Sequence, residues 1–264
     1  MHANYHTHTY RCRHAEGTER EYIERAIEGG LKVLGFSDHT PMPVPDEYYV
    51  ACPTVRMHPE EFEGYCDTVL ALKNEYRRDI DIKLGVEAEY VRPLFGEMTA
   101  FLDQYPLDYM ILGQHVVGNI LYGDETVWSS QPHPEPSILH TYLEQVLEAL
   151  RTGRFLYVAH PDLIHFTGDP AIYDREMRTF CQEVKKLDIP LEINFLGLAD
   201  HRNYPNQEFW RIAGEVGNRV VFGSDAHRPV DVWQPETLKV AEEMVRKYNL
   251  NYDTKFMLDE TAVQ

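Results

Sequence analysis

The chain has few cysteines, and none of them occurs in a pattern that indicates a disulfide framework or a structural zinc site. Its four cysteines are Cys12, Cys52, Cys66 and Cys181. They include no CxxC pair and follow no regular spacing, which argues against a disulfide-stabilised domain and against a zinc knuckle. We expect all four to be reduced thiols that serve packing.

The sequence also lacks long apolar segments. No apolar run approaches the roughly 20 residues that a membrane-spanning helix needs. The first residues, MHANYHTHTYRCRH, do not contain the apolar stretch of a signal peptide. We therefore expect a cytoplasmic protein that does not associate with membranes.

Positive charge is scarce. The chain contains 25 Lys and Arg residues against 43 Asp and Glu residues, giving a formal net charge of −18. A field of this sign repels polyanions, so no nucleic-acid partner is expected. A small anionic substrate would need local positive charge, which bound metal ions could supply. The sequence indicates no protein partner.

The 264 residues, 43% of them hydrophobic, are enough to bury one sizeable core. Short apolar runs typical of strands alternate with amphipathic segments typical of helices. The expected strands are residues 3–6, 32–37, 80–87, 109–112, 155–159, 190–194 and 219–223. The expected helices are residues 19–28, 59–77, 137–150, 174–187, 206–215 and 236–248. This alternation predicts a single α/β domain over residues 1–264, built as a barrel of parallel strands covered by helices. Residues 40–59 contain five prolines and are expected to form an extended loop.

Histidines and acidic residues gather where the expected strands end. His6 and His8 lie two positions apart at the end of the first strand, so their side chains point to the same side. Asp225 and His227 repeat this spacing after the last strand. The other residues of this kind are Asp38, His39, Glu87, His115 and His160, with His14 in the loop that follows the first strand.

In a parallel barrel all these strand ends meet around one mouth, so the side chains are expected to converge. Imidazoles with a few carboxylates suit zinc, iron or manganese, and Glu87 could bridge two ions. The candidate ligands exceed the capacity of one ion and predict two to three divalent ions. They are His6, His8, His14, His39, Glu87, His115, His160, Asp225 and His227. Glu89, on the same strand face as Glu87, is the alternative carboxylate ligand.

These motifs resemble a known family. They are HTH at His6 and His8, GFSDHTPMP around Asp38, GVEAEY at Glu87, GQH at His115, AHP at His160, EIN at Glu192 and GSDAHRP at Asp225. Their order and spacing resemble the polymerase and histidinol phosphatase (PHP) family, and within it the L-histidinol-phosphate phosphatase branch. The resemblance implies a distorted (β/α)7 barrel of the TIM-barrel-like PHP type with a trinuclear metal centre.

The resemblance also implies how the ligands are shared. His6, His8, Glu87 and Asp225 would hold one ion, and Glu87 would bridge to another. His14, His39 and His227 would hold a second ion. Glu87, His115 and His160 would hold the third.

One position departs from the family pattern. Phosphatases of this branch usually carry an arginine shortly after EIN that resembles a phosphate clamp, but this chain has Ala199 there and Arg202 three positions later. We expect Arg202 to take that role, with Arg11 and Arg228 as further candidates for phosphate binding. Tyr122 and Trp128 lie after the His115 motif and are candidates for binding the leaving group.

The expected activity is hydrolysis of L-histidinol phosphate to L-histidinol and phosphate, a step of histidine biosynthesis, by a metal-activated hydroxide. Asp38 is expected to orient a neighbouring ligand. Asp38 and His227 are also the candidates for protonating the leaving group. The alternatives are a phosphatase of sugar phosphates or nucleotides, a phosphodiesterase or exonuclease, an amidohydrolase, and a module that binds metals without catalysis.

Overall fold

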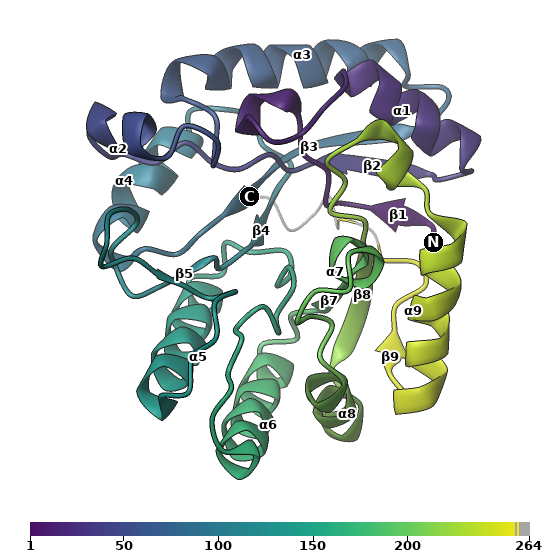
Figure 1. The fold of residues 1–264 in the computed structure, drawn as a ribbon. Coiled ribbons are helices and arrows are strands. Elements are labelled where there is room, and N and C mark those ends of the chain that lie inside the picture. Colours follow the sequence, from purple (N-terminus) through teal and green to yellow (C-terminus); the bar gives the residue numbers. More distant parts are fainter. Residues whose placement is uncertain (257, 259–264) are drawn as a thin grey trace.

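A computed structural model of the chain describes residues 1–256 and Leu258. Its central strands are parallel and form two sheets (Figure 1). The first sheet has the order β1-β2-β3-β4, and the second has the order β7-β8-β9. Their bounds are Ala3–Asn4 (β1), Val33–Phe36 (β2), Asp81–Ala88 (β3), Tyr109–Leu112 (β4), Leu191–Asn194 (β7), Arg219–Gly223 (β8) and Asn251–Tyr252 (β9).

Isolated parallel bridges join the two sheets into a ring. Val158 bridges both Leu112, at the end of β4, and Leu191, at the start of β7. On the other side, Thr7 after β1 bridges Ala226 after β8. The segment expected as a strand at residues 155–159 thus occupies a strand position, although its bridges are isolated ones at Val158. The ring confirms the expected distorted barrel, since the strands from both ends of the chain close on each other.

Helices surround the strands (Figure 1). The expected helices are present as α1 (Glu19–Glu28), α3 (Phe62–Glu75), α5 (Pro136–Arg151), α6 (Pro170–Lys186), α8 (Gln207–Val216) and α9 (Pro235–Tyr248). Four of them begin at a recognisable signal. α1 starts with a capping box between Thr18 and Glu21, and α5, α6 and α9 carry proline in their first turn.

Three helices were not expected from the sequence. α4 (Arg92–Leu102) was missed because Pro93 and Gly96 obscure its periodicity, although Pro93 lies in the first turn, where proline is tolerated. α2 (Asp46–Ala51) lies inside the segment expected to be extended, so that expectation was wrong for these residues. α7 (Phe195–Ala199) is a short helix directly after β7, capped by the side chain of Asn194.

The barrel interior is apolar at one end. Tyr5, Val33, Tyr109, Ile111, Tyr157, Ala159 and Val221 form a buried cluster inside the ring. The hydroxyl of Tyr109 donates to the backbone oxygens of Tyr5 and Phe36, 2.7 and 3.0 Å away, which satisfies this buried polar group. Because apolar side chains fill this end, the polar residues that follow the strands are left to line the opposite end.

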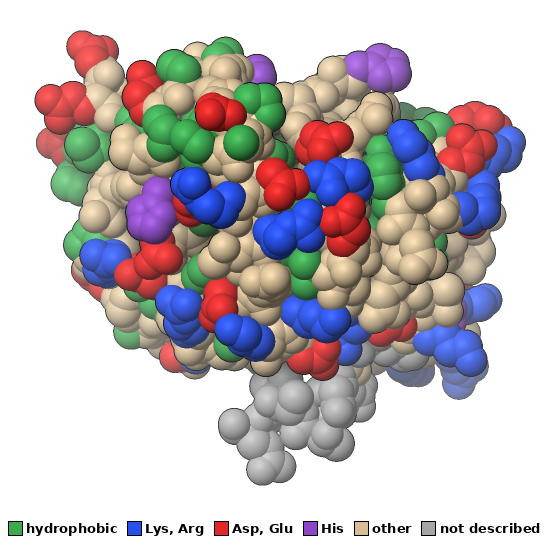
Figure 2. All heavy atoms as spheres, turned by 90° about the horizontal axis from the view of Figure 1, so that it is seen from below, with side chains coloured by type: hydrophobic (Ala, Val, Ile, Leu, Met, Phe, Trp, Pro, Cys, Tyr) green, Lys and Arg blue, Asp and Glu red, His purple; other side chains and the backbone are tan. Residues whose placement is uncertain are grey.

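Acidic and basic side chains are interleaved on the outer face shown in Figure 2. Between α6 and α8, Glu215 accepts from Arg178 at 2.8 Å and from Arg211 at 2.6 Å, and Arg211 also pairs with Asp174. Such surface pairs contribute little to stability individually. Their mixture of signs offers no continuous basic surface to a polyanion on this face.

Within the described residues, no helix combines the length and the apolar character that crossing a membrane would require.

Candidate metal centre

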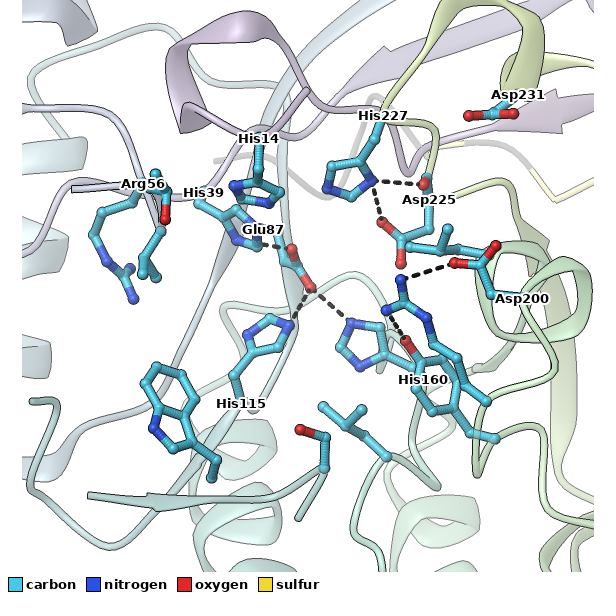
Figure 3. Close-up of a pocket in the computed structure, with 18 of the residues that line it drawn as sticks. His14, His39, Arg56, Glu87, His115, His160, Asp200, Asp225, His227 and Asp231 are labelled. Carbon is cyan, nitrogen blue, oxygen red and sulfur yellow. Dashed lines mark hydrogen bonds and ion pairs between the residues drawn. The ribbon is translucent and has the colours of Figure 1, made fainter. Parts of the chain in front are cut away.

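A cavity of about 920 Å³ opens at the carboxyl ends of the barrel strands. Figure 3 shows that its floor is formed by imidazoles that surround one carboxylate, Glu87. The expected ligands that line it are His14, His39, Glu87, His115, His160, Asp225 and His227. His6 and His8 lie fully buried beneath them. The structure therefore brings all the expected ligands together.

Glu87 lies at the centre of this group. Its Oε2 is 3.0 Å from Nδ1 of His39, and its Oε1 is 3.0 Å from Nε2 of His160 and 3.7 Å from Nε2 of His115. The Nε2 atoms of His6 and His8 lie 3.6 and 3.5 Å from Oε2. A carboxylate with imidazoles around both oxygens has the geometry of a bridging ligand. This position favours Glu87 over Glu89 as the carboxylate ligand.

Beneath Glu87, His6 is oriented from behind by Glu192, whose Oε2 is 2.9 Å from Nδ1 of His6. The side-chain nitrogen of Asn194 donates to Glu192 at 2.8 Å and to Asp225 at 3.0 Å. Nε2 of His6 then faces Oδ1 of Asp225 at 3.4 Å. An acid behind a ligating imidazole fixes the ring and its tautomer. This role of Glu192 was not predicted from the sequence. The available signal was its spacing of two from Asn194, which puts both side chains on one face of the strand.

A second group lies closer to solvent. The ligand-type atoms of His14, His39 and His227 all lie within 4.8 Å of one another. Nδ1 of His14 is 2.9 Å from the backbone oxygen of Cys12, and Nδ1 of His227 is 3.0 Å from that of Asp225. Burial, together with the neighbouring His8, lowers the pKa of His39 and of His227 to about 3. Both rings are therefore neutral near pH 7 and can offer a lone pair.

The buried donor atoms of this centre fit divalent cations. Among the described residues, several buried atoms of the centre have no hydrogen-bond partner: Nε2 of His6, both ring nitrogens of His8, Oε2 of Glu87 and Nδ1 of His160. Buried polar atoms without partners are costly, so such a cluster requires another source of compensation. Although burial opposes it, the nearby carboxylates of Asp225, Asp38 and Glu87 raise the pKa of His8 to about 9, so the acids of the centre attract positive charge. Nitrogen and oxygen donors of this kind fit zinc, iron or manganese.

Two of these residues adopt backbone conformations that side chains rarely take. His160 has a φ of 31° and Asp225 a φ of 49°. Left-handed backbone at residues other than glycine costs free energy and is concentrated at functional sites. At both positions the chain turns sharply after a strand, which directs the side chain inward.

Asp38 lies behind His8 and outside the cavity lining. Its Oδ1 is 3.5 Å from Nδ1 of His8 and accepts from the backbone nitrogen of His39 at 2.9 Å, and Oδ2 accepts from the hydroxyl of Thr9. This agrees with an orienting role. It argues against Asp38 as the proton donor, because His8 and His39 hold its pKa below the usual value in spite of burial, and it does not reach the cavity.

The candidates for substrate binding separate into two sets. Arg202, Arg228 and Trp128 line the cavity. Arg202 donates to the hydroxyl of Tyr204 at 3.1 Å and to Asp200 at 3.0 Å, and Arg228 pairs with Asp231 at 2.8 Å. The other two candidates, Arg11 and Tyr122, lie elsewhere.

Arg11 and Tyr122 lie outside the cavity lining. Arg11 is buried, pairs with Glu19 and donates to the hydroxyl of Thr68 at 3.2 Å, so its charge is used within the protein. The ring of Tyr122 packs edge-on against Tyr48 at 5.4 Å. Sequence reasoning missed Tyr204 and Arg56, which do line the cavity. Neither follows a metal-type motif closely enough to be singled out.

Comparisons with known proteins show which family and which relatives this chain resembles. The model of the PHP domain matches residues 4–195. A probable histidinol-phosphatase from Deinococcus radiodurans is 30% identical over 234 residues, covering 86% of each chain. A probable phosphatase from Photobacterium profundum is 25% identical over 251 residues, covering 92% of this chain and 84% of that one.

Among solved structures, histidinol phosphate phosphatase from Lactococcus lactis, in complex with zinc, L-histidinol and phosphate, aligns with a TM-score of 0.71 and 20% identity. The alignment covers 95% of this chain and 94% of that one, which confirms the fold. Together with the family model, which spans most of the chain, these relatives confirm the resemblance seen in the motifs: this chain belongs to the PHP domain family.

Proposed function

We propose that this protein is a metal-dependent phosphomonoesterase that hydrolyses L-histidinol phosphate to L-histidinol and phosphate. The observation that carries the proposal is the convergence of buried, unpaired imidazole atoms around Glu87 at the floor of an open cavity. The phosphatase names of its relatives support the reaction class. The chain uses strands from residue 3 to residue 252 in one barrel, which supports a single catalytic domain.

Two to three divalent ions at this centre would neutralise phosphoryl charge and lower the pKa of a bound water. His6, His8, Glu87 and Asp225 would hold one ion, and His14, His39 and His227 would hold an outer one. Glu87, His115 and His160 would hold the third. The low pKa of His227 suits a ligand better than a general acid, because near pH 7 the ring is neutral and its one N–H faces the backbone oxygen of Asp225.

Arg202 would bind the phosphoryl group. It lines the cavity, and Tyr204 and Asp200 hold its guanidinium in position. Arg228 lines the same cavity and is held in the same way by Asp231. A planar guanidinium can donate two parallel hydrogen bonds to a phosphate. Arg202 therefore takes the role of the arginine that is absent at Ala199.

The leaving group of L-histidinol phosphate carries an amine and an imidazole. Trp128 offers an aromatic face to such a group, and the carboxylates of Glu16 and Asp231 also line the cavity. An aromatic face and carboxylates suit a cationic ligand. The site therefore combines a centre for phosphate with a wall that suits positive charge.

A phosphatase of other small phosphate esters, such as sugar phosphates or nucleotides, is the second candidate. The observation in its favour is the size of the cavity, about 920 Å³, which is near the upper end of the range for ligand sites, roughly 300–1,000 Å³. A phosphodiesterase acting on nucleic acid is disfavoured by the net charge of −18.

The test is phosphate release from L-histidinol phosphate, compared with a panel of sugar phosphates and nucleotides, by protein reconstituted with zinc, iron or manganese. We expect a kcat/KM for L-histidinol phosphate at least about 100-fold above the panel. Arg202→Ala should lower it about 100-fold through the loss of charged hydrogen bonds, whereas Arg20→Ala, at an exposed pair with Glu75, should change it little.

The substrate profile distinguishes between the candidate functions. A flat profile or a different best substrate would replace L-histidinol phosphate and leave a PHP phosphatase. Metal-loaded protein that releases phosphate from no monoester would overturn the proposed reaction itself.

A further inference from the structure

Arg56 is a buried cation in the cavity wall, close to His115 (Figure 3). It follows α2 in the segment between β2 and α3, and only 3% of it is exposed. Its Nε donates to the hydroxyl of Tyr48 at 2.6 Å, Nη1 to the backbone oxygen of Thr40 at 3.0 Å, and Nη2 to Oε2 of Glu89 at 2.5 Å. Each nitrogen of the guanidinium therefore donates to a group of the protein.

Glu89 connects Arg56 to the metal centre. It is also 3% exposed, and its second oxygen, Oε1, lies 3.2 Å from Nδ1 of His115. A buried carboxylate is costly unless a cation compensates it, and Arg56 supplies that charge at close range.

His115 receives its orientation from this contact. A proton on Nδ1, on the side that faces Glu89, leaves the lone pair on Nε2, which lies 3.7 Å from Oε1 of Glu87. Glu192 acts on His6 in the same way. The two acids differ in what holds them. Glu192 contacts His6, His160 and Asn194, whereas Glu89 is bound to an arginine, Arg56.

We infer that Arg56 is a positioning residue for His115: it holds the carboxylate of Glu89 in the place that directs Nε2 of His115 toward the metal centre. The inference rests on the metal binding in the proposed function. The ion that His115 would hold then depends on the segment containing α2. Tyr48, which orients Arg56, also packs against Tyr122 in the connection that follows His115, so both segments are anchored at the same point.

The test measures bound metal directly. Wild type, Arg56→Met, Arg56→Lys, Glu89→Gln and His115→Ala are loaded with zinc, and both the number of ions per chain and their affinities are measured by chelator competition. We expect Arg56→Met and Glu89→Gln each to weaken one ion about 10–100-fold and to leave the others unchanged. His115→Ala should weaken the same ion, and Arg56→Lys should restore part of the loss because it keeps the charge.

The combined variant decides whether Arg56 acts through His115. If it does, adding Arg56→Met to His115→Ala should weaken that ion no further than His115→Ala alone. An additional loss would overturn the inference, as would folded Arg56→Met protein with wild-type affinities. Circular dichroism checks the fold, and the nearly isosteric Glu89→Gln decides the matter if Arg56→Met does not fold. Wild-type protein that binds no metal would instead overturn the proposed function.

Discussion

Gly113 lies against the carboxylate of Glu87, so closely that a β-carbon on Gly113 would be 1.8 Å from Oε1 and 2.4 Å from Cδ of Glu87. Real β-carbons do not approach other atoms so closely. Glu87 has little freedom to yield, because it is 2% exposed and has imidazoles around both oxygens. The glycine of the GQH motif is thus required for the central carboxylate to occupy its place.

Gly113→Ala should therefore displace Glu87 and disrupt the metal centre. We expect fewer bound ions per chain and a kcat at least about 100-fold lower, since misplacing a reacting site by about 1 Å costs this much. Metal analysis and steady-state kinetics check this. Gly96→Ala, in α4 with nothing within 4 Å of the added carbon, is the matched control and should stabilise the fold by about 0.5–1 kcal/mol. Wild-type metal content in Gly113→Ala would contradict the expectation.

Glu192→Gln should weaken the ion held by His6. The substitution preserves shape but removes the charge that faces Nδ1 of His6 at 2.9 Å. We expect the affinity for that ion to fall about 10–100-fold, measured by chelator competition. Glu183→Gln, on the exposed side of α6 and paired with Lys186, is the control and should bind metal like wild type. Equal affinities in both variants would show that the acid behind His6 is dispensable.

Removal of metal should destabilise the protein. The buried atoms of His6, His8 and Glu87 that have no partner are compensated only when cations bind. A ligand that binds the folded state alone stabilises it by about 2.7 kcal/mol per site at a free concentration 100 times its Kd. Calorimetry with and without chelator should show a lower Tm for the metal-free protein, restored when metal is added back. An identical Tm in both states would argue against tight binding at this centre.

Arg11→Met should affect stability and leave substrate binding unchanged. The substitution leaves Glu19 buried without the cation that now pairs with it. Breaking a buried pair in this way costs about 3–5 kcal/mol, which denaturant unfolding of the metal-loaded protein would detect. Because Arg11 lies outside the cavity, the KM for a phosphate ester should stay within about twofold of wild type. A large rise in KM would instead support its expected role in phosphate binding.

Features that depend on neighbours along the chain were predictable from the sequence. The spacing of two between His6 and His8, and between Asp225 and His227, predicted that each pair shares a side, because side chains alternate along extended backbone. The βα alternation predicted the barrel and hence the convergence of the strand ends. α4 was not predicted, because Pro93 and Gly96 suggested a break in the chain. The structure accommodates both residues within the helix.

The sequence by itself determined which residue types meet at the mouth of the barrel, since strand order and side-chain alternation follow from local patterns. Only the tertiary structure decided which partner each side chain has. Glu87 and Glu89 share a strand face, yet Glu87 lies among several imidazoles, whereas Glu89 faces His115 and is bound by Arg56, 33 positions earlier in the chain. Arg11 lies between metal motifs but is buried against Glu19, whereas Arg56 reaches the cavity. The physical reason is that charge pairing of buried groups depends on distances between packed elements, which sequence separation does not encode.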